Sequence, residues 1–208
     1  AFNDNGIQIL DVSVPSDIYA NGYLVDIPSL TLAGASDVDT FTIDGNTYAI
    51  VAAFDDNGVQ IIDISNPASP SPAGKLIDNG FATALAGASG VDTFTLTGTY
   101  AGTYAIVTAF RDDGVQIIDV SNPENIVAKD YLTDDGTRTL DEARDVKTFT
   151  IDSKTYAIVV AVADNGVQII DVTNPESIIA LSSLEDFDEM DALNGAYDVE
   201  IFTIDGST

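Results

Sequence analysis

"FDDNGVQIIDISNP", residues 54–67, occurs four times in this chain with small changes. The other copies read "FNDNGIQILDVSVP" at 2–15, "FRDDGVQIIDVSNP" at 110–123 and "VADNGVQIIDVTNP" at 162–175. Their glycines recur at intervals of 52, 56 and 52 residues, and they are Gly6, Gly58, Gly114 and Gly166. A period of this length is typical of repeat architectures, in which one supersecondary unit is copied along the chain.

Each repeat predicts four β-strands separated by turn signals. In the second unit the strand candidates are residues 38–44, 47–54, 59–65 and 73–78. The first candidate is rich in Thr, Phe and Ile, as strands are. Asn57-Gly58 is a β-hairpin signal, and we expect a positive φ angle at both positions. Prolines follow the third candidate and end it, because proline cannot donate to a strand ladder.

The second and third strands of a unit are apolar on both faces, as residues 49–52 and 61–62 illustrate. An antiparallel sheet with one face in water alternates apolar and polar residues instead. Each sheet is therefore expected to be covered on both sides, as in a propeller. We predict an all-β fold, a β-propeller built of four-stranded antiparallel blades, with four repeats of about 52 residues in residues 1–208. The turn motifs lie at 4–12, 56–64, 112–120 and 164–172.

The repeats also predict that one blade is split between the termini. Phe2 matches Phe54 at the end of a second strand, and residues 202–208 follow a first strand. A counterpart of residues 48–52 is missing from this split blade. Because unpaired strand edges invite pairing with another chain, we expect the segment to belong to a longer array or to join end to end with other copies.

One unit is longer than the others at a single place. "LTGTYAGTY" at 96–104 stands where the neighbouring units read "IDGNTY" at 43–48 and "IDSKTY" at 151–156. The extra residues fall between the first and second strands, and the tip of a turn is where a repeat tolerates an insertion.

The repeated motif resembles a known family. "GVQIIDVSNP" looks like the LVIVD repeat of bacterial and archaeal surface proteins, and the Asp-Val-Ser-Asn-Pro end is its most specific part. The resemblance covers all four units, although these units are longer than the usual repeat of the family. It implies a β-propeller, an extracellular or cell-surface location, and no catalytic activity shared across the family.

The composition restricts the partners and cofactors. The chain has 7 Lys and Arg against 34 Asp and Glu, a net charge of −27, which repels nucleic acid and anionic membranes. No apolar run approaches the ~20 residues of a membrane span, so we expect no membrane insertion in this segment. There is no Cys and no His. The usual ligands of zinc and copper are thus missing, and the expected metal, if one binds, is Ca²⁺ held by oxygen.

Positions shared by all units are expected to be structural. Asp11, Asp63, Asp119 and Asp171 end the third strand, where a carboxylate can accept backbone N–H bonds of the next turn. Gln8, Gln60, Gln116 and Gln168 follow the hairpin, and we expect hydrogen-bonded structural amides. We expect the aromatic residues of the first strand to lie in the core: Phe41, Phe94, Phe149 and Phe202. A ring of functional carboxylates and an amide ladder between blades are the alternatives.

The segments that join one unit to the next vary, and functional residues are expected there. They are residues 26–37, 78–90, 133–145 and 185–198. Asp186, Asp188 and Asp191 fall within six residues and form the candidate Ca²⁺ site, although the spacing is not that of an EF-hand. A solvated acidic loop is the alternative. A weaker cluster comprises Asp134, Asp135, Asp141 and Asp145.

Catalysis has little support in the sequence, and we assign no catalytic residue. Without His or Cys the common nucleophile–base pairs are missing, and among 34 acids some suitable pair always occurs by chance. We predict a non-enzymatic extracellular surface, scaffold or adhesion module, with other copies of itself or neighbouring surface proteins as partners. The alternative is a Ca²⁺-dependent hydrolase of the propeller type that uses carboxylates of the channel face. A concave pocket with convergent polar groups and shifted pKa values would favour the hydrolase.

Cations are expected to stabilise this fold. Folding concentrates 34 acids, and salt screens their repulsion over about 8 Å at 0.15 M, so the melting temperature should rise gradually with salt. A true Ca²⁺ site would saturate and add about 2.7 kcal/mol at a hundredfold excess over its Kd. The measurement is a melting series at constant ionic strength with Ca²⁺ or chelator, on the parent and on Asp188→Asn. A Ca²⁺ effect no larger than that of matched salt would contradict the site.

Overall fold

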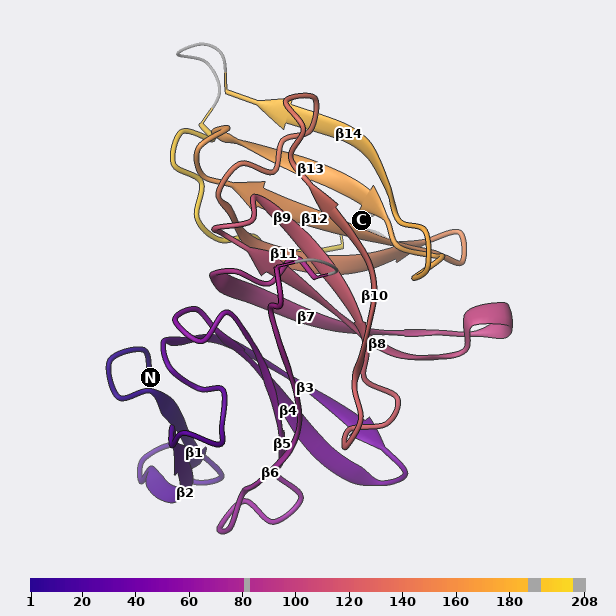
Figure 1. Ribbon diagram of the computed structural model, residues 1–208. Helices are drawn as coiled ribbons and strands as arrows, with labels where there is room; N and C mark the ends of the chain where they lie inside the picture. The colour runs from indigo at the N-terminus through magenta and orange to yellow at the C-terminus, as the bar shows by residue number, and fades with distance from the viewer. Residues whose placement is uncertain (81–82, 187–191, 204–208) are drawn as a thin grey trace.

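The computed structural model describes residues 1–80, 83–186 and 192–203, and antiparallel β-sheets dominate it (Figure 1). Blade 1 is a two-stranded sheet of β1 (Gly6–Asp11) and β2 (Tyr19–Val25). Blade 2 consists of β3 (Ala35–Ile43), β4 (Asn46–Ala53), β5 (Gly58–Asp63) and β6 (Ser71–Ile77). Blade 3 consists of β7 (Ala88–Leu96), β8 (Gly102–Ala109), β9 (Gly114–Asp119) and β10 (Val127–Thr133). Blade 4 consists of β11 (Ala143–Ile151), β12 (Lys154–Ala161), β13 (Gly166–Asp171) and β14 (Ile179–Glu185).

The predicted β-propeller fold is confirmed. In each four-stranded sheet the strands are neighbours in chain order and pair antiparallel. The first strands are the inner ones, because β7 contacts both β3 and β11 while the fourth strands lie at the outer edges. The blades follow one another from the indigo end to the yellow end of the chain (Figure 1). Every linker therefore carries the chain from the outer strand of one blade to the inner strand of the next.

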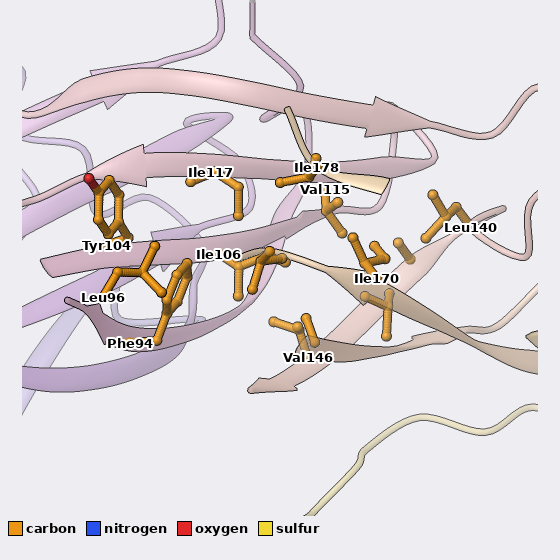
Figure 2. Packing of buried hydrophobic residues seen from close by; sticks show 14 residues of the cluster. Phe94, Leu96, Tyr104, Ile106, Val115, Ile117, Leu140, Val146, Ile170 and Ile178 are labelled. Carbon is orange, nitrogen blue, oxygen red and sulfur yellow. The ribbon is translucent and has the colours of Figure 1, made fainter. Parts of the chain in front are cut away.

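The core lies between successive blades, as we expected from strands that are apolar on both faces. Figure 2 shows the cluster between blades 3 and 4, where Ile106, Val115 and Ile117 meet Val146 and Ile170. A similar cluster joins blades 2 and 3, and a smaller one joins blades 1 and 2. Burying one such Ile fully contributes about 2 kcal/mol. Each blade is therefore stabilised mainly by its neighbours.

The N-terminal half of the predicted split blade is present as a two-stranded sheet. The sheet of β1 and β2 has the third and fourth strands of a blade, and β1 pairs with β2 alone. Residues 199–203 match a first strand in sequence but have no strand pairing. Within the described part of the chain these two pieces therefore do not form one sheet.

The repeated Asp and Gln residues have the structural roles that were predicted. The Asp63 carboxylate accepts the backbone N–H of Ser65 at 2.8 Å, and the pKa of Asp63 is lowered by Ser65 through its side chain and its backbone. The corresponding bonds in the other units join Asp11 to Ser13, Asp119 to Ser121 and Asp171 to Thr173. The amide of Gln60 donates to the carbonyl of Gly74 in β6 at 3.1 Å, where the pairing of β5 and β6 has a register shift.

The hairpin prediction was right for Asn57 and wrong for Gly58. Asn57 has φ 54°, as do the equivalent residues Asn5, Asp113 and Asn165 to within a few degrees. Gly58 does not have a positive φ, and its role is a close approach instead. A Cβ at Gly58 would lie 2.3 Å from the carbonyl oxygen of Leu76 in β6. The motif therefore needs glycine because a neighbouring backbone leaves no room for a side chain.

The prediction for the first-strand Phe residues was correct for two of them. Phe41 and Phe94 are buried and stack on Tyr48 and Tyr104. Phe149 stacks on Tyr156 but is only half-buried. Phe202 is 73% exposed. A first-strand Phe is covered by the second strand of its own blade and by the next blade, and residues 192–203 have neither.

The buried hydroxyl of Thr31 provides a stability test. It has no hydrogen-bond partner among the described residues, whereas the hydroxyl of its counterpart Thr139 donates to Glu185 at 2.7 Å. In blade 2, which follows Thr31, the residue equivalent to Glu185 is Ile77. Ile77 pairs with Gly58 as Glu185 pairs with Gly166. We expect Thr31→Val to raise the free energy of unfolding by about 1 kcal/mol and Thr139→Val to lower it by about the same. Urea unfolding of both variants measures this, and equal effects would contradict it.

Candidate functional site

The linkers are held by the hairpin turns of two blades at once. The backbone N–H of Gly87 donates to Oδ1 of Asn57 in the preceding blade at 2.9 Å. The N–H of Ala86 donates to Oδ2 of Asp112 in the following blade at 2.8 Å. The same pair of bonds recurs in the next linker, from Glu142 to Asp113 and from Asp141 to Asp164. These segments are therefore fixed clamps between blades, and this explains why the Asp-Asn-Gly turn is repeated.

Carboxylates of the inner strands bind the open edge of the neighbouring inner strand. Asp37 Oδ2 in β3 accepts the N–H of Val91 in β7 at 2.8 Å. Asp39 Oδ2 accepts both the N–H and the hydroxyl of Thr93, at 2.7 and 2.5 Å. These donors lie on the edge of β7 that does not pair with β8. The carboxylates therefore satisfy backbone donors that an isolated blade would leave unpaired.

The contact between β7 and β11 repeats this arrangement with one change. Asp92 Oδ2 accepts the N–H and the hydroxyl of Thr148, at 2.9 and 2.5 Å. Gly90 stands where β3 has Asp37, and a Cβ at Gly90 would lie 2.8 Å from Cα of Asp145. Glycine therefore allows the two inner strands to approach more closely at this point.

Lys147 is a cation among these axial carboxylates. Its Nζ lies 3.3 Å from Asp92 Oδ1. Burial lowers the pKa of Lys147, but the carboxylates of Asp92, Asp145 and Asp37 outweigh burial, so the pKa is raised overall. Lys147 is thus charged at neutral pH and offsets part of the negative charge along the axis.

A pocket of about 180 Å³ opens at the axial end where the inner strands begin. Its lining residues are Ser36, Asp37, Ser89, Gly90, Arg144, Asp145, Tyr197 and Asp198. The Ser36 hydroxyl donates to the carbonyl of Ser89 at 2.8 Å, and the Ser89 hydroxyl donates to that of Arg144 at 2.8 Å. Both hydroxyls therefore join blades and are not paired with a general base.

Two carboxyls of this pocket, those of Asp37 and Asp145, have raised pKa values. Burial raises the pKa of Asp37, and the N–H groups of Val91 and Val38 offset it only in part. Burial and a hydrogen bond with the Asp198 carboxyl raise the pKa of Asp145 to about 6. Asp145 Oδ2 also accepts the N–H of Val199 at 2.9 Å. A carboxyl that titrates near neutral pH can exchange a proton there, which is the chemistry of a general acid or base.

Arg144 lies between aromatic rings at the rim of the pocket. Its guanidinium carbon is 4.3 Å from the ring centroid of Tyr197 and 5.9 Å from that of Phe110, and the guanidinium also donates to the Tyr197 hydroxyl. Arg111 stacks in the same way on Phe54, at 4.3 Å. These cation–π contacts hold both guanidinium groups in place.

The predicted Ca²⁺ site lies mainly outside the described residues. Asp188 and Asp191 fall there, while Asp186 accepts the N–H groups of Leu193 and Asn194 at 3.3 and 3.1 Å. The side chains of the weaker cluster have separate partners. The Asp134 carboxylate accepts the N–H of Gly136, and Asp135 forms a salt bridge with Arg138 at 2.8 Å. Asp145 lies in the axial pocket. Within residues 1–80, 83–186 and 192–203, no group of three or more acidic side chains could hold a metal ion.

The axial residues were missed by the sequence analysis. Each of these residues lies next to a valine that recurs in the first strand of every unit, and the positions on either side of this valine vary between units. They are Asp37 and Asp39 beside Val38, Asp92 beside Val91, and Lys147 beside Val146. This variation on either side of a constant valine is the signal that could have pointed to them. Also missed was the pairing itself, since Asp39 and Thr93 are 54 residues apart.

The comparisons with known proteins agree with the fold. The family model of the LVIVD repeat matches residues 1–23, 35–77, 100–133 and 153–186. The chain belongs to the LVIVD repeat family. The resemblance of the "GVQIIDVSNP" motif is therefore confirmed. No curated protein matches this LVIVD-repeat chain. Within residues 1–80, 83–186 and 192–203 the structure has no helix with the length and hydropathy that a membrane crossing requires.

Solved structures similar to the LVIVD-repeat chain are distant in sequence. A protein from Lactobacillus plantarum has a TM-score of 0.63 and 13% identity, over 90% of this chain and 51% of that one. The periplasmic gluconolactonase of Pseudomonas aeruginosa has a TM-score of 0.63 and 12% identity, over 88% and 49%. A putative 6-phosphogluconolactonase from Bacteroides fragilis has a TM-score of 0.56 and 15% identity, over 83% of this chain and 45% of that one. The chain thus spans about half the length of these structures, and identities this low show a common fold alone.

The raised pKa of Asp145 predicts how stability depends on pH. Because the folded pKa of about 6 exceeds the ordinary 3.8, the stabilising effect of protonation is complete below about pH 4 and is lost as the pH rises through 6. Asp145→Asn keeps an oxygen for the Val199 N–H but cannot ionise. Between pH 5 and 7 the parent should lose about 1 kcal/mol more than this variant, after allowance for the solvent that reaches a half-buried group.

Thermal or urea unfolding at several pH values measures the difference. Asp44→Asn, in the turn between β3 and β4, is the control and should follow the parent. Parallel pH profiles of the parent and Asp145→Asn would show that Asp145 does not titrate in this range.

Proposed function

We propose that this chain is a non-enzymatic extracellular module, a surface scaffold or adhesion element, whose partner is a second copy of itself. The observation that carries the proposal is the rear face of blade 1, the face turned away from blade 2. Leu10 on this face is 52% exposed, whereas its counterparts in the other blades, Ile62, Ile118 and Ile170, are fully buried.

The rest of the rear face follows the same pattern. Val12 and Ile18 are 61% and 60% exposed. Their counterparts in blade 4, Val172 and Ile178, are buried and pack in the cluster between blades 3 and 4. An apolar face that is covered in every other blade fits a further blade.

The front face of blade 4 supplies the complementary surface. Val167 and Ile169 are half-buried, and Leu184, which pairs with Val167, is 57% exposed. The equivalent of Leu184 in blade 3 is Leu132, which packs against the core between blades 3 and 4. A front face of one copy on a rear face of another is a heterologous contact, which gives a ring if the rotation closes. Two copies would together match the length of the similar solved structures, of which one copy spans about half.

The proposal predicts a salt-dependent dimer. Each copy carries a charge of −27, so salt should strengthen association by screening repulsion. We expect the mass of two chains by light scattering at high concentration, and of one chain for Leu10→Asp. Ile77→Asp changes an apolar residue that is 43% exposed but lies in blade 2, away from both faces, and should remain dimeric. A parent that stays monomeric at all concentrations and salt levels would overturn the proposal.

The second candidate function is a carboxylate-dependent hydrolase acting at the axial pocket. The observation that favours it is Asp145, with a pKa of about 6 and a hydrogen bond to Asp198. Two carboxyls that share a proton can act as acid and base in hydrolysis. Turnover of chromogenic glycoside or ester substrates that is abolished by Asp145→Asn, with the fold retained, would support this candidate. Residues 187–191, which hold most of the predicted Ca²⁺ site, are outside the described residues, so metal dependence remains a prediction.

A further inference from the structure

The turn between the first and second strands of blade 3 is longer than in blades 2 and 4 and has a different conformation. In blade 2, β3 and β4 are joined through Asp44 and Gly45, with φ 50° and 82°, and in blade 4, β11 and β12 are joined through Asp152 and Ser153, with φ 50° and 63°. In blade 3 the same connection contains a 3-10 turn, Gly98–Tyr100. Because every repeat must satisfy the blade fold, the three extra residues are not needed for the blade itself.

The 3-10 turn forms one wall of a groove of about 480 Å³ against blade 4. Blade 3 contributes the end of β7 and the turn, and blade 4 contributes the β11–β12 turn and the residues after β13. The lining residues are Thr95, Leu96, Thr97, Thr99, Tyr100, Thr150, Ser153, Thr155 and Thr173. The groove lies at the end of β7, whereas the axial pocket includes Gly90 near the start of that strand. It is therefore separate from the candidate site described above.

Tyr100 is held in a fixed position on this wall. Its ring packs against the buried cluster between blades 3 and 4, and its carbonyl accepts the hydroxyl of Tyr104 at 3.1 Å. It presents a half-buried aromatic side chain to the groove. A ring held in this way can pack against the apolar face of a ligand without a large loss of conformational entropy.

The chemistry of the groove is uniform. Eight of its nine lining residues carry a hydroxyl and none carries a charge. The hydroxyl of Thr97, at the start of the 3-10 turn, makes no capping bond to that turn. Hydroxyls both donate and accept, so they match a ligand that does the same. The net charge of −27 disfavours an anionic ligand.

We propose that this groove binds a neutral saccharide, with its hydroxyls bonded by Thr97, Thr99, Thr150 and Ser153 and one sugar face on Tyr100. The groove combines an aromatic surface with many neutral donors and acceptors, which is what an uncharged polyhydroxylated ring requires. The site goes beyond the proposed assembly function, because it uses neither the rear face of blade 1 nor the front face of blade 4.

The test is binding of the chain to an array of neutral and sialylated oligosaccharides, followed by titration of the bound neutral glycans. We expect at least one neutral glycan to bind, and its sialylated form to bind more weakly. Tyr100→Ala should weaken binding by about tenfold or more, and the double variant Thr97→Ala, Thr150→Ala should weaken it similarly. Thr42→Ala changes the equivalent of Thr95 and Thr150 in blade 2 and should bind like the parent.

A turn exchange separates binding from folding. Replacing residues 96–104 by the six residues of 43–48 gives blade 3 the turn of blade 2. This variant should keep its β-sheet circular dichroism spectrum and a cooperative melting transition but lose binding. The proposal is overturned if the parent binds no neutral glycan, or if the exchanged variant binds as well as the parent.

Discussion

The open edge of each inner strand is the constraint on which the rest of this propeller depends. An inner strand pairs with its own blade on one side, and its other edge faces the next inner strand, with backbone N–H groups that need acceptors. Asp37, Asp39 and Asp92 supply them by reaching across to Val91, Thr93 and Thr148. Blades are thus joined at the axis by side chains that replace the hydrogen bonds of a continuous sheet, and the cores between blades add the apolar contribution.

The need for hydrogen-bond acceptors explains part of the acidity of the chain. Many of the acids have a structural partner in the backbone: the axial carboxylates bind strand edges, Asp63 and its equivalents bind turns, and Asp112 binds a linker. Charge-assisted bonds of this kind are stronger than neutral ones, which offsets part of the repulsion among 34 acids. Asp145 binds the N–H of Val199 in the same way, but burial and its hydrogen bond with the Asp198 carboxyl raise its pKa.

The strands, the hairpins and the propeller could be predicted because they depend on local patterns that are copied four times. Gly58 was predicted to lie in the turn with a positive φ, but it begins β5. Glycine is needed there because Leu76 O approaches closely, and that approach depends on the pairing of β5 with β6. The axial network could not be predicted, since Asp39 and Thr93 meet only through the packing of two blades. The exposure of Phe202 could not be predicted either. Its sequence motif matches that of the buried Phe41, but a first-strand Phe is buried by neighbouring strands and not by its motif.

The clamp on each linker has a consequence for how such proteins change length during evolution. The linker between blades 2 and 3 is bonded to Asn57 of blade 2 and to Asp112 of blade 3. Both residues belong to the hairpin turn that recurs in every repeat. A duplicated segment of one period, cut at any point, therefore carries one complete set of clamp partners into its new position. Recombination between repeats can add or remove a blade while every junction keeps both of its bonds, so blade number can vary without new interactions having to evolve.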